Sequence, residues 1–289
     1  MEMDLTARLA NPTLRLSKSQ RLLADYITEH CDKAAFLTAN RLGDAVGVSE
    51  STVVRFAVRL GYEGYPELQR AVQELIRNKL TAVQRLEVTS ELLSGSDVLR
   101  SVMREDIDRI NTTLTSIDNE AFDKAVQYAI SARQIYIVGL RSSSALAEFL
   151  YFYFNLIFEG VKLVSGSSLN AVPEQLLHAT KDDCVICISF PRYSRTTVDA
   201  VEYASSKGAS VIAITDGPMS PITSHASCSL FAMSDTASFV DSLVAPMSLL
   251  NALVVAVGMH RRQDLVRVFE DLEQIWDRYS VYRAADDLE

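Results

Sequence analysis

Short apolar runs rich in β-branched residues alternate with helical stretches from about residue 133 onward. The runs read "QIYIVG", "GVKLV", "DCVICIS", "ASVIAIT" and "CSLFAM", and segments such as "TTVDAVEYASSKG" separate them. Strands that read as continuous apolar runs and are joined by helices are typical of a parallel sheet covered on both faces. The sequence therefore predicts an α/β domain, followed by helix again over residues 241–283.

Two turns of this predicted sheet are rich in hydroxyl groups. "GLRSSS" (139–144) follows the first strand, and "ISFPRYSRTT" (188–197) includes the end of the strand "DCVICIS". Ligands of parallel sheets bind at the carboxyl ends of the strands, where backbone amides at helix N-termini favour oxyanions. We therefore expect the two loops to hold one phosphate between them. The candidate ligand-binding residues are Gly139, Arg141, Ser142, Ser143, Ser144, Ser189, Arg192, Tyr193, Ser194 and Thr197.

A simpler explanation of these hydroxyl groups is helix capping. Ser142 or Ser143 would cap a helix over residues 145–158, and Ser194 would cap one over 197–207, since serine is a preferred N-cap residue. Each loop taken alone fits either interpretation. Two such loops in one sheet favour a ligand site.

Residues 17–80 have the spacing of closely packed short helices. In "TANRLGDAVGVSESTVVRFAVRLGY" (38–62), Thr38 is expected to cap one helix and Ser49 the next. Gly47 and Gly61 stand where a helix end needs a positive φ. Val53, Val54 and Phe56 are expected to point inward. Two short helices joined by a glycine-containing turn are typical of a helix-turn-helix unit.

In such a unit the second helix enters the major groove of DNA by its N-terminal residues. Serine and threonine hydroxyls suit phosphate or base-edge contacts, and Arg55 suits a bidentate contact with guanine. The alternative is a structural helical hairpin with a solvated polar face. The candidate DNA-binding residues are Thr38, Arg41, Ser49, Glu50, Ser51, Thr52, Arg55 and Arg59.

The distribution of charge is compatible with that interpretation. The net charge is −9, but residues 1–85 hold 12 Lys and Arg against 10 Asp and Glu, whereas the remainder holds 16 against 27. A local field, rather than the net charge, decides whether a face attracts DNA. An acidic body with a near-neutral N-terminal part is therefore consistent with a local DNA-binding face.

The stretch "LSKSQRLLADYITEH…TANRLGDAVGVSESTVVRFAVRLGYEGYPELQ" resembles the N-terminal domain of the RpiR (MurR/RpiR) family of bacterial transcriptional regulators. "STVVRFAVRLGYEGYPEL" is its most specific part. The resemblance implies that the second half is a sugar isomerase (SIS) domain, in agreement with the predicted sheet. We expect an all-α helix-turn-helix domain over residues 1–79, a helical connector over 80–117, and the α/β SIS domain with C-terminal helices over 118–289.

The SIS resemblance implies glycine-containing loop patterns, from which this chain departs. In the first pattern, G-x-G-x-S, Gly139 and Ser143 match and Arg141 replaces the second glycine. In the second, S-x-S-G-x-T, Ser189 matches, Ser194 stands for the threonine, and Pro191 and Arg192 replace Ser and Gly. A guanidinium fork at either position adds an oxyanion donor. The resemblance also implies that "TASFVDS" (236–242) begins a helix that lines the ligand, which adds Ser238.

Catalysis by such a domain requires an acid/base group near the sugar. Glu174, which is also a candidate ligand-binding residue, and His178 are the nearby acid/base candidates, and both are also explained as exposed helix residues. We therefore expect no catalytic residue, cofactor or metal, and a regulator that senses a phosphorylated sugar or a related metabolite. A phosphosugar isomerase with an appended helical domain is the alternative. Palindromic operator DNA would require a homodimer or homotetramer.

Cysteines and apolar stretches further limit the class of protein. Cys184 and Cys187 form a C-x-x-C, but within a strand they point to opposite faces, which indicates buried thiols rather than a redox or zinc site. No secretory signal opens the chain. The apolar stretches 145–160 and 243–259 are shorter than the roughly 20 residues that a spanning helix needs. We expect a cytoplasmic protein that does not enter the membrane.

Overall fold

The computed structural model describes residues 5–9, 16–76, 81–93, 97–166, 171–234 and 239–281. They form two compact units. One consists of residues 1–101 together with 235–241, and the other consists of 102–234 together with 242–289. The expected connector, residues 80–117, is thus divided between the two units at position 101.

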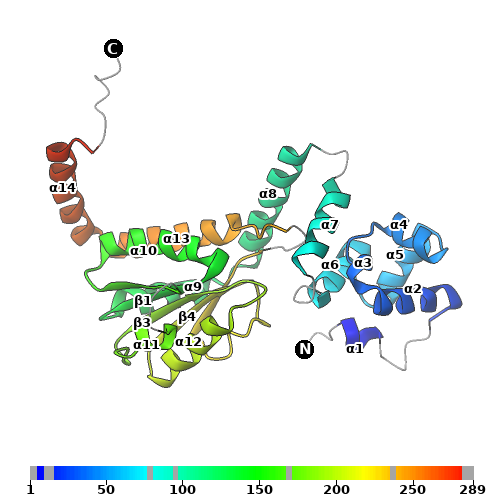
Figure 1. Cartoon of the computed structure of the whole chain (residues 1–289), viewed down its shortest axis with the longest axis horizontal. Coiled ribbons are helices and arrows are strands. Elements are labelled where there is room, and N and C mark those ends of the chain that lie inside the picture. Colours follow the sequence, from blue (N-terminus) through cyan, green and yellow to red (C-terminus); the bar gives the residue numbers. More distant parts are fainter. Residues whose placement is uncertain are drawn as a thin grey trace, which may run out of the picture. The chain divides into compact units, whose positions relative to one another are not determined.

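The first unit is helical, as predicted. Its helices surround one apolar core built around Leu23, Ile27, Leu42, Val53 and Phe56. In chain order (Figure 1) they are α1 (Leu5–Leu9), α2 (Lys18–Glu29), α3 (Cys31–Ala34), α4 (Ala39–Val46), α5 (Glu50–Arg59), α6 (Tyr65–Ile76) and α7 (Ala82–Leu93).

Helices α4 and α5 form the predicted helix-turn-helix unit. Thr38 caps α4 by accepting a hydrogen bond from the amide of Arg41, 3.3 Å away. Ser49 occupies the N-cap position of α5 but makes no capping hydrogen bond, so the expectation that its side chain caps this helix is wrong. Gly47 and Gly61 have φ of 76° and 89°, the left-handed conformation expected at both helix ends. The prediction that Val54 points inward is wrong. Its side chain is 39% exposed, because the buried stripe of α5 runs through Val53, Phe56 and Ala57.

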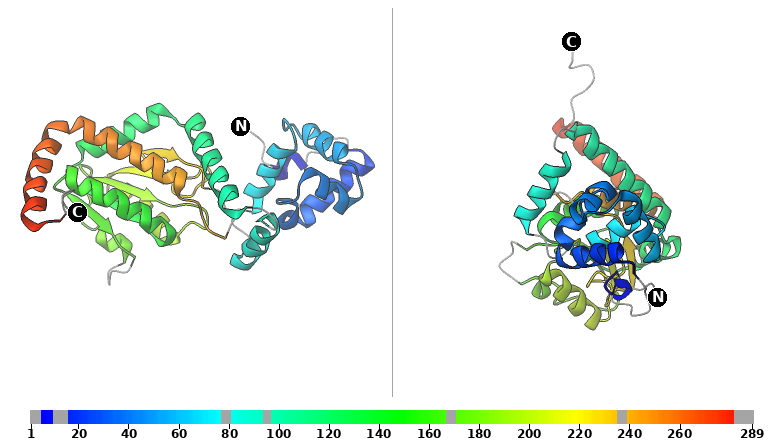
Figure 2. Two further views of the ribbon diagram at one scale, coloured as in Figure 1. Left: turned by 90° about the horizontal axis from the view of Figure 1, so that it is seen from above. Right: turned by 90° about the vertical axis from the view of Figure 1, so that its right-hand side faces the viewer.

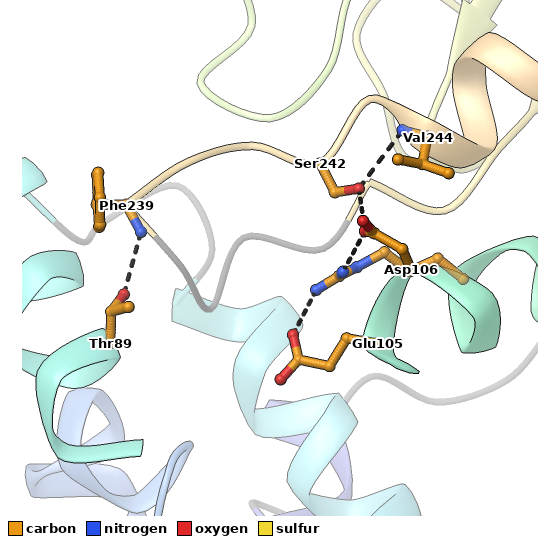
Figure 3. A network of polar contacts seen from close by, with 7 residues as sticks. Thr89, Glu105, Asp106, Phe239, Ser242 and Val244 are labelled. Carbon is orange, nitrogen blue, oxygen red and sulfur yellow. Dashed lines mark hydrogen bonds and ion pairs between the residues drawn. The ribbon is translucent and has the colours of Figure 1, made fainter. Parts of the chain in front are cut away.

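A segment far along the chain packs on α7. The Arg85 side chain is 1% exposed and forms an ion pair with Asp241, with 3.0 Å between Nη1 and Oδ1. One turn later on α7, the hydroxyl of Thr89 accepts a hydrogen bond from the amide of Phe239 (Figure 3). The same hydroxyl donates a hydrogen bond to the carbonyl of Arg85. Residues 239–241 therefore complete the first unit, although they are distant from it in sequence.

The second unit is the predicted α/β domain. Its sheet has five parallel strands in the order β2-β1-β3-β4-β5. The strands are β1 (Ile135–Gly139), β2 (Val161–Val164), β3 (Cys184–Ile188), β4 (Ser210–Thr215) and β5 (Cys228–Phe231). The helices are α8 (Val98–Ser116), whose first turn belongs to the first unit, then α9 (Asn119–Ser131), the 3-10 turn η1 (Arg141–Ser143), α10 (Ser144–Ile157), α11 (Val172–Gln175), α12 (Arg195–Ser206), α13 (Val244–His260) and α14 (Arg262–Tyr279).

Helices cover both faces of the sheet. On one face α9, α10 and α13 pack against the strands through Ile135, Ile137 and their neighbours, and on the other α11 and α12 pack against Tyr136 and Val138 (Figures 1 and 2). Successive strand residues alternate between the two cores, as the pleat requires. The sheet is therefore buried on both sides, which explains the continuous apolar runs.

Polar contacts fix the start of α13. The hydroxyl of Ser242 donates a hydrogen bond to Asp106 on α8, 2.7 Å away, and accepts one from the amide of Val244 (Figure 3). Asp106 also pairs with Arg109, whose second partner is Glu105. The expectation that residues 236–242 begin this helix is wrong, because α13 begins at Val244.

Helix α14 departs sharply from α13. The two helices are bent by 99° at the break after His260, and α14 has no buried residue. Among the residues that the structure describes, no single helix is long and apolar enough to span a membrane. The bent pair α13 and α14 reaches the required length and apolar composition only when the two helices are counted together.

Candidate functional site

A cavity of about 900 Å³ opens at the carboxyl end of the sheet, beside β1 and β2. The strand order reverses between β1 and β3, which is the topological switch point at which such sheets bind ligands. The lining residues are Gly139, Leu140, Arg141, Ser144, Glu148, Leu163, Val164, Ser165, Gly166, Ala171, Val172, Ser194 and Thr196. The cavity is thus lined by residues from both hydroxyl-rich loops.

The first wall of the cavity begins at the tight junction between β1 and α10. A Cβ atom on Gly139 would lie 2.6 Å from the carbonyl oxygen of Ser143 and 2.7 Å from the Cβ of Ala147. Only glycine allows the helix to start this close to the end of the strand. Arg141 lines the wall from the 3-10 turn η1, and Ser144 and Glu148 line it from α10, one helical turn apart.

Both arginines that replace glycines of the family pattern keep a glycine-like backbone. Arg141 has φ of 58° and Arg192 has φ of 62°, and Ser280 is the only other non-glycine residue with positive φ in the described ranges. A left-handed conformation costs a non-glycine residue about 1–2 kcal/mol. Strained residues of this kind cluster at functional sites. Arg141 lines the cavity, whereas Arg192 is exposed and lies outside its lining.

The serines at the starts of α10 and α12 do not act as helix caps. Ser143 and Ser194 occupy the N-cap positions, but neither side chain makes a capping hydrogen bond. The capping explanation of these hydroxyls is therefore wrong for both residues. Ser194 lines the cavity with Thr196, while Ser143 is buried beneath it.

Other sequence candidates lie around the cavity rather than on its wall. The hydroxyl of Tyr193 donates to Asp216 at 2.9 Å, which ties its loop to the end of β4. Thr197 is buried, and its hydroxyl has no hydrogen-bond partner among the described residues. Outside the lining are Ser142, Ser143, Ser189, Arg192, Tyr193, Thr197, Glu174 and His178, and Ser238 lies outside the described residues.

Sequence reasoning missed three polar residues of the lining. Glu148 is on α10, Ser165 follows β2, and Thr196 is in the first turn of α12. Glu148 could have been predicted as a lining residue from the sequence, because it lies one turn beyond Ser144 on the same helix face. Gln175 holds the Ser165 backbone in place, since its side chain bonds both the amide, at 3.2 Å, and the carbonyl, at 2.9 Å.

Half of the predicted DNA-binding residues, Ser49 to Thr52, lie at the start of α5, and Arg55 follows on the same helix. Ser49 bonds to the hydroxyls of Ser51 and Thr52 at 3.0 and 2.9 Å, and Arg55 donates to Thr52 at 3.4 Å. The side chains of Ser49, Glu50, Ser51, Arg55 and Arg59 are exposed and Thr52 is partly exposed. The helix therefore presents a polar, hydrogen-bonding edge opposite its buried stripe. Thr38 caps the preceding helix, and Arg41 is exposed on it.

Comparison with known proteins identifies both units. Residues 3–79 match the model of the helix-turn-helix domain, rpiR family, and residues 129–256 match the SIS domain. The chain thus carries an RpiR-family helix-turn-helix domain followed by an SIS domain. A relative, an uncharacterized HTH-type transcriptional regulator of Caldanaerobacter subterraneus, is 23% identical over 279 residues, which are 94% of this chain and 96% of the relative.

Two solved structures share the fold of this chain. The sugar isomerase domain of an RpiR transcription factor from Sphaerobacter thermophilus has a TM-score of 0.59 and 24% identity, and the match covers 62% of this chain and 99% of that domain. The NanR protein of Vibrio vulnificus, solved in complex with ManNAc-6P, has a TM-score of 0.58 and 22% identity over 93% of this chain and 97% of NanR.

The cysteines of the sheet are buried, as predicted. Cys184 and Cys187 lie on opposite faces of β3, in different cores. Burial raises the pKa of both thiols far above the ordinary value, and raises the pKa of Cys228 to about 11. Within the described ranges, no group of three or more His, Cys, Asp or Glu side chains could hold a metal ion.

Proposed function

We propose that this RpiR-family regulator binds operator DNA through α5 and senses a phosphorylated sugar or related metabolite in the cavity of its SIS domain. The cavity at the switch point of the sheet carries the proposal, because two helix N-termini and an arginine meet there. The effector shifts the population between arrangements of the protein that differ in DNA affinity. We expect this regulation to take place in the cytoplasm.

We assign the phosphate of the effector to the part of the cavity next to the starts of α10 and α12. Ser144 and Ser194 line this part, and the positive ends of the two helix dipoles favour an anion there. The side chain of Arg141 makes no hydrogen bond or ion pair with any described residue. Its guanidinium is therefore available to donate hydrogen bonds to a phosphate oxygen. The complex of the structurally similar NanR with ManNAc-6P supports a phosphosugar as the ligand class.

Sensing is favoured over isomerisation. Glu174 and His178, the acid/base candidates from the sequence, are exposed and lie outside the cavity lining. The isomerase alternative would then depend on Glu148, the acidic residue in the lining. Turnover of aldose or ketose phosphates by the purified protein would contradict the assignment as a sensor.

The protein is expected to be at least a dimer. The helices that the sequence points to, now α10 and α13, expose Phe152, Tyr153, Val255 and Met259. Exposed apolar side chains gathered on helices mark association surfaces, and a palindromic operator matches a two-fold symmetric reader. Size-exclusion chromatography with light scattering should give a mass of at least twice 32.0 kDa at micromolar concentration. A monomer at that concentration would contradict this part of the proposal.

Replacing Ser144 and Ser194 together by alanine should remove the response to the effector. A thermal-shift screen of phosphosugars identifies the ligand, since a saturating ligand at 100 times its Kd stabilises the folded state by about 2.7 kcal/mol. The double variant should lose most of that shift while keeping its own melting temperature, because the Ser194 side chain caps no helix. DNA binding without effector should be unchanged.

The matched control is Ser206→Ala, at the far end of α12, which should keep the full ligand-induced shift. If the Ser144 and Ser194 double variant responds to the ligand like the wild type, the effector does not bind in this cavity.

A further inference from the structure

Glu148 is a carboxylate in a cavity otherwise suited to an anion. It lines the wall formed by α10, and its side chain is exposed to the cavity. No hydrogen bond or ion pair joins it to the part of the chain that the structure describes. A structural salt bridge therefore does not account for its position.

The helix geometry separates Glu148 from the phosphate position. Ser144 and Glu148 are four residues apart on α10, which corresponds to a rise of about 6 Å along the axis. A phosphate next to Glu148 would be repelled, whereas one at the first turn of α10 gains the helix dipole, Ser194 and Arg141. The cavity thus has a guanidinium and hydroxyl donors next to the first turn of α10, and an acceptor carboxylate one turn farther along that helix.

An ionised carboxylate only accepts hydrogen bonds. Its partner on the ligand must therefore be a donor, and hydroxyl and amino groups of a sugar are donors. A second carboxylate on the ligand would meet Glu148 as a like charge and lose both the hydrogen bond and the favourable electrostatics. The negative charge of Glu148 therefore influences which class of phosphosugar the cavity binds.

We propose that Glu148 is a specificity-determining residue of the effector site, which accepts hydrogen bonds from the sugar part of the ligand. It admits phosphosugars whose sugar part is neutral or bears an amine, and it rejects phosphorylated sugar acids. The inference rests on the proposed function, since it requires the phosphate to bind next to the first turn of α10 in the same cavity.

The test compares Glu148→Gln with the wild type on matched ligands. The probes are aldose 6-phosphates, each paired with the corresponding phosphorylated aldonic acid, and inorganic phosphate, with dissociation constants from isothermal calorimetry. The wild type should prefer the neutral member of each pair. In the variant this preference should fall by about tenfold or more, because a hydrogen bond to a charged group is stronger than one to an amide and the like-charge repulsion disappears.

Binding of inorganic phosphate tests the proposed phosphate site separately from the proposed role of Glu148. The affinity of Glu148→Gln for inorganic phosphate should equal or exceed that of the wild type, since the glutamine removes a nearby negative charge. Glu202→Gln, an exposed carboxylate on α12 outside the cavity lining, is the matched control and should leave every affinity unchanged. The melting temperatures without ligand should agree among all three proteins, because Glu148 is exposed and makes no contact that folding requires.

Three results would overturn the inference. The preference of the wild type for the neutral ligand persists unchanged in Glu148→Gln, or the wild type prefers the sugar acids, or Glu202→Gln alters the preference to the same extent. If neither the phosphosugars nor inorganic phosphate bind to the wild type, the proposed function itself fails, and the inference about Glu148 fails with it.

Discussion

Replacing Arg55 and Thr52 together by alanine is expected to abolish sequence-specific DNA binding. Both side chains lie on the exposed edge of α5, where they hydrogen-bond to each other at 3.4 Å. A bidentate arginine contact with guanine contributes about 1–3 kcal/mol of discrimination, and a dimer would lose it at both half-sites. The fold should be unaffected, because the buried stripe of α5 consists of Val53, Phe56 and Ala57.

The measurement requires a specific site first. In vitro selection from a random DNA pool with the wild type supplies it, and binding is then compared at one fixed salt concentration, because phosphate contacts depend steeply on salt. Arg70→Ala removes an exposed arginine from α6 and is the matched control. It should retain the preference for the selected site. Specific binding that survives in the Arg55 and Thr52 double variant would show that α5 is not the reading helix.

Replacing Asp241 by alanine is expected to destabilise the first unit strongly. Arg85 is 1% exposed and Asp241 is 12% exposed, so the variant leaves a guanidinium buried without this partner. Breaking a buried ion pair on one side costs about 3–5 kcal/mol, whereas replacing both members by apolar residues is often neutral. The double variant Arg85→Met, Asp241→Leu should therefore recover most of the lost stability.

Amide hydrogen exchange shows which part of the molecule is destabilised by the replacement of Asp241. Exchange of the amides of α7 should accelerate in Asp241→Ala and return toward the wild-type rate in the double variant. The strands of the second unit should keep their protection in both proteins, and this provides the internal control. Equal acceleration in the single and the double variant would contradict this expectation, because it would mean that the ion pair stabilises the first unit more than an apolar pair at the same positions does.

The sequence predicted the layered fold because its signals are local. Apolar runs such as "IYIVG" and "CVICI" identify buried parallel strands without any tertiary information. Gly47 and Gly61 mark the ends of the helices in the same way, since a positive φ is a property of the residue itself. The error at Val54 came from reading consecutive valines as equally buried, while the stripe of a helix passes over one of them.

The parts that could not be predicted depend on distant residues. Nothing near Arg85 in the sequence indicates that its partner is Asp241, which lies 156 positions away. Glu148 resembles any exposed helical glutamate until the wall that it shares with Arg141 and Ser144 is known. Two serines at helix starts resemble caps, and only the observed geometry shows that neither makes a capping bond.

Residues 235–241 make the first unit discontinuous in sequence. The backbone passes from one unit to the other three times, near positions 101, 234 and 241. A fragment that ends at residue 79 lacks α7, and a fragment that begins at residue 118 carries Asp241 but lacks Arg85. A single backbone cleavage near position 101 would leave residues 1–101 attached to the 235–241 segment only through noncovalent contacts such as the Arg85–Asp241 ion pair. Exchange of the helix-turn-helix unit between such regulators during evolution would therefore require two segments of the gene, those encoding residues 1–101 and 235–241, to change together.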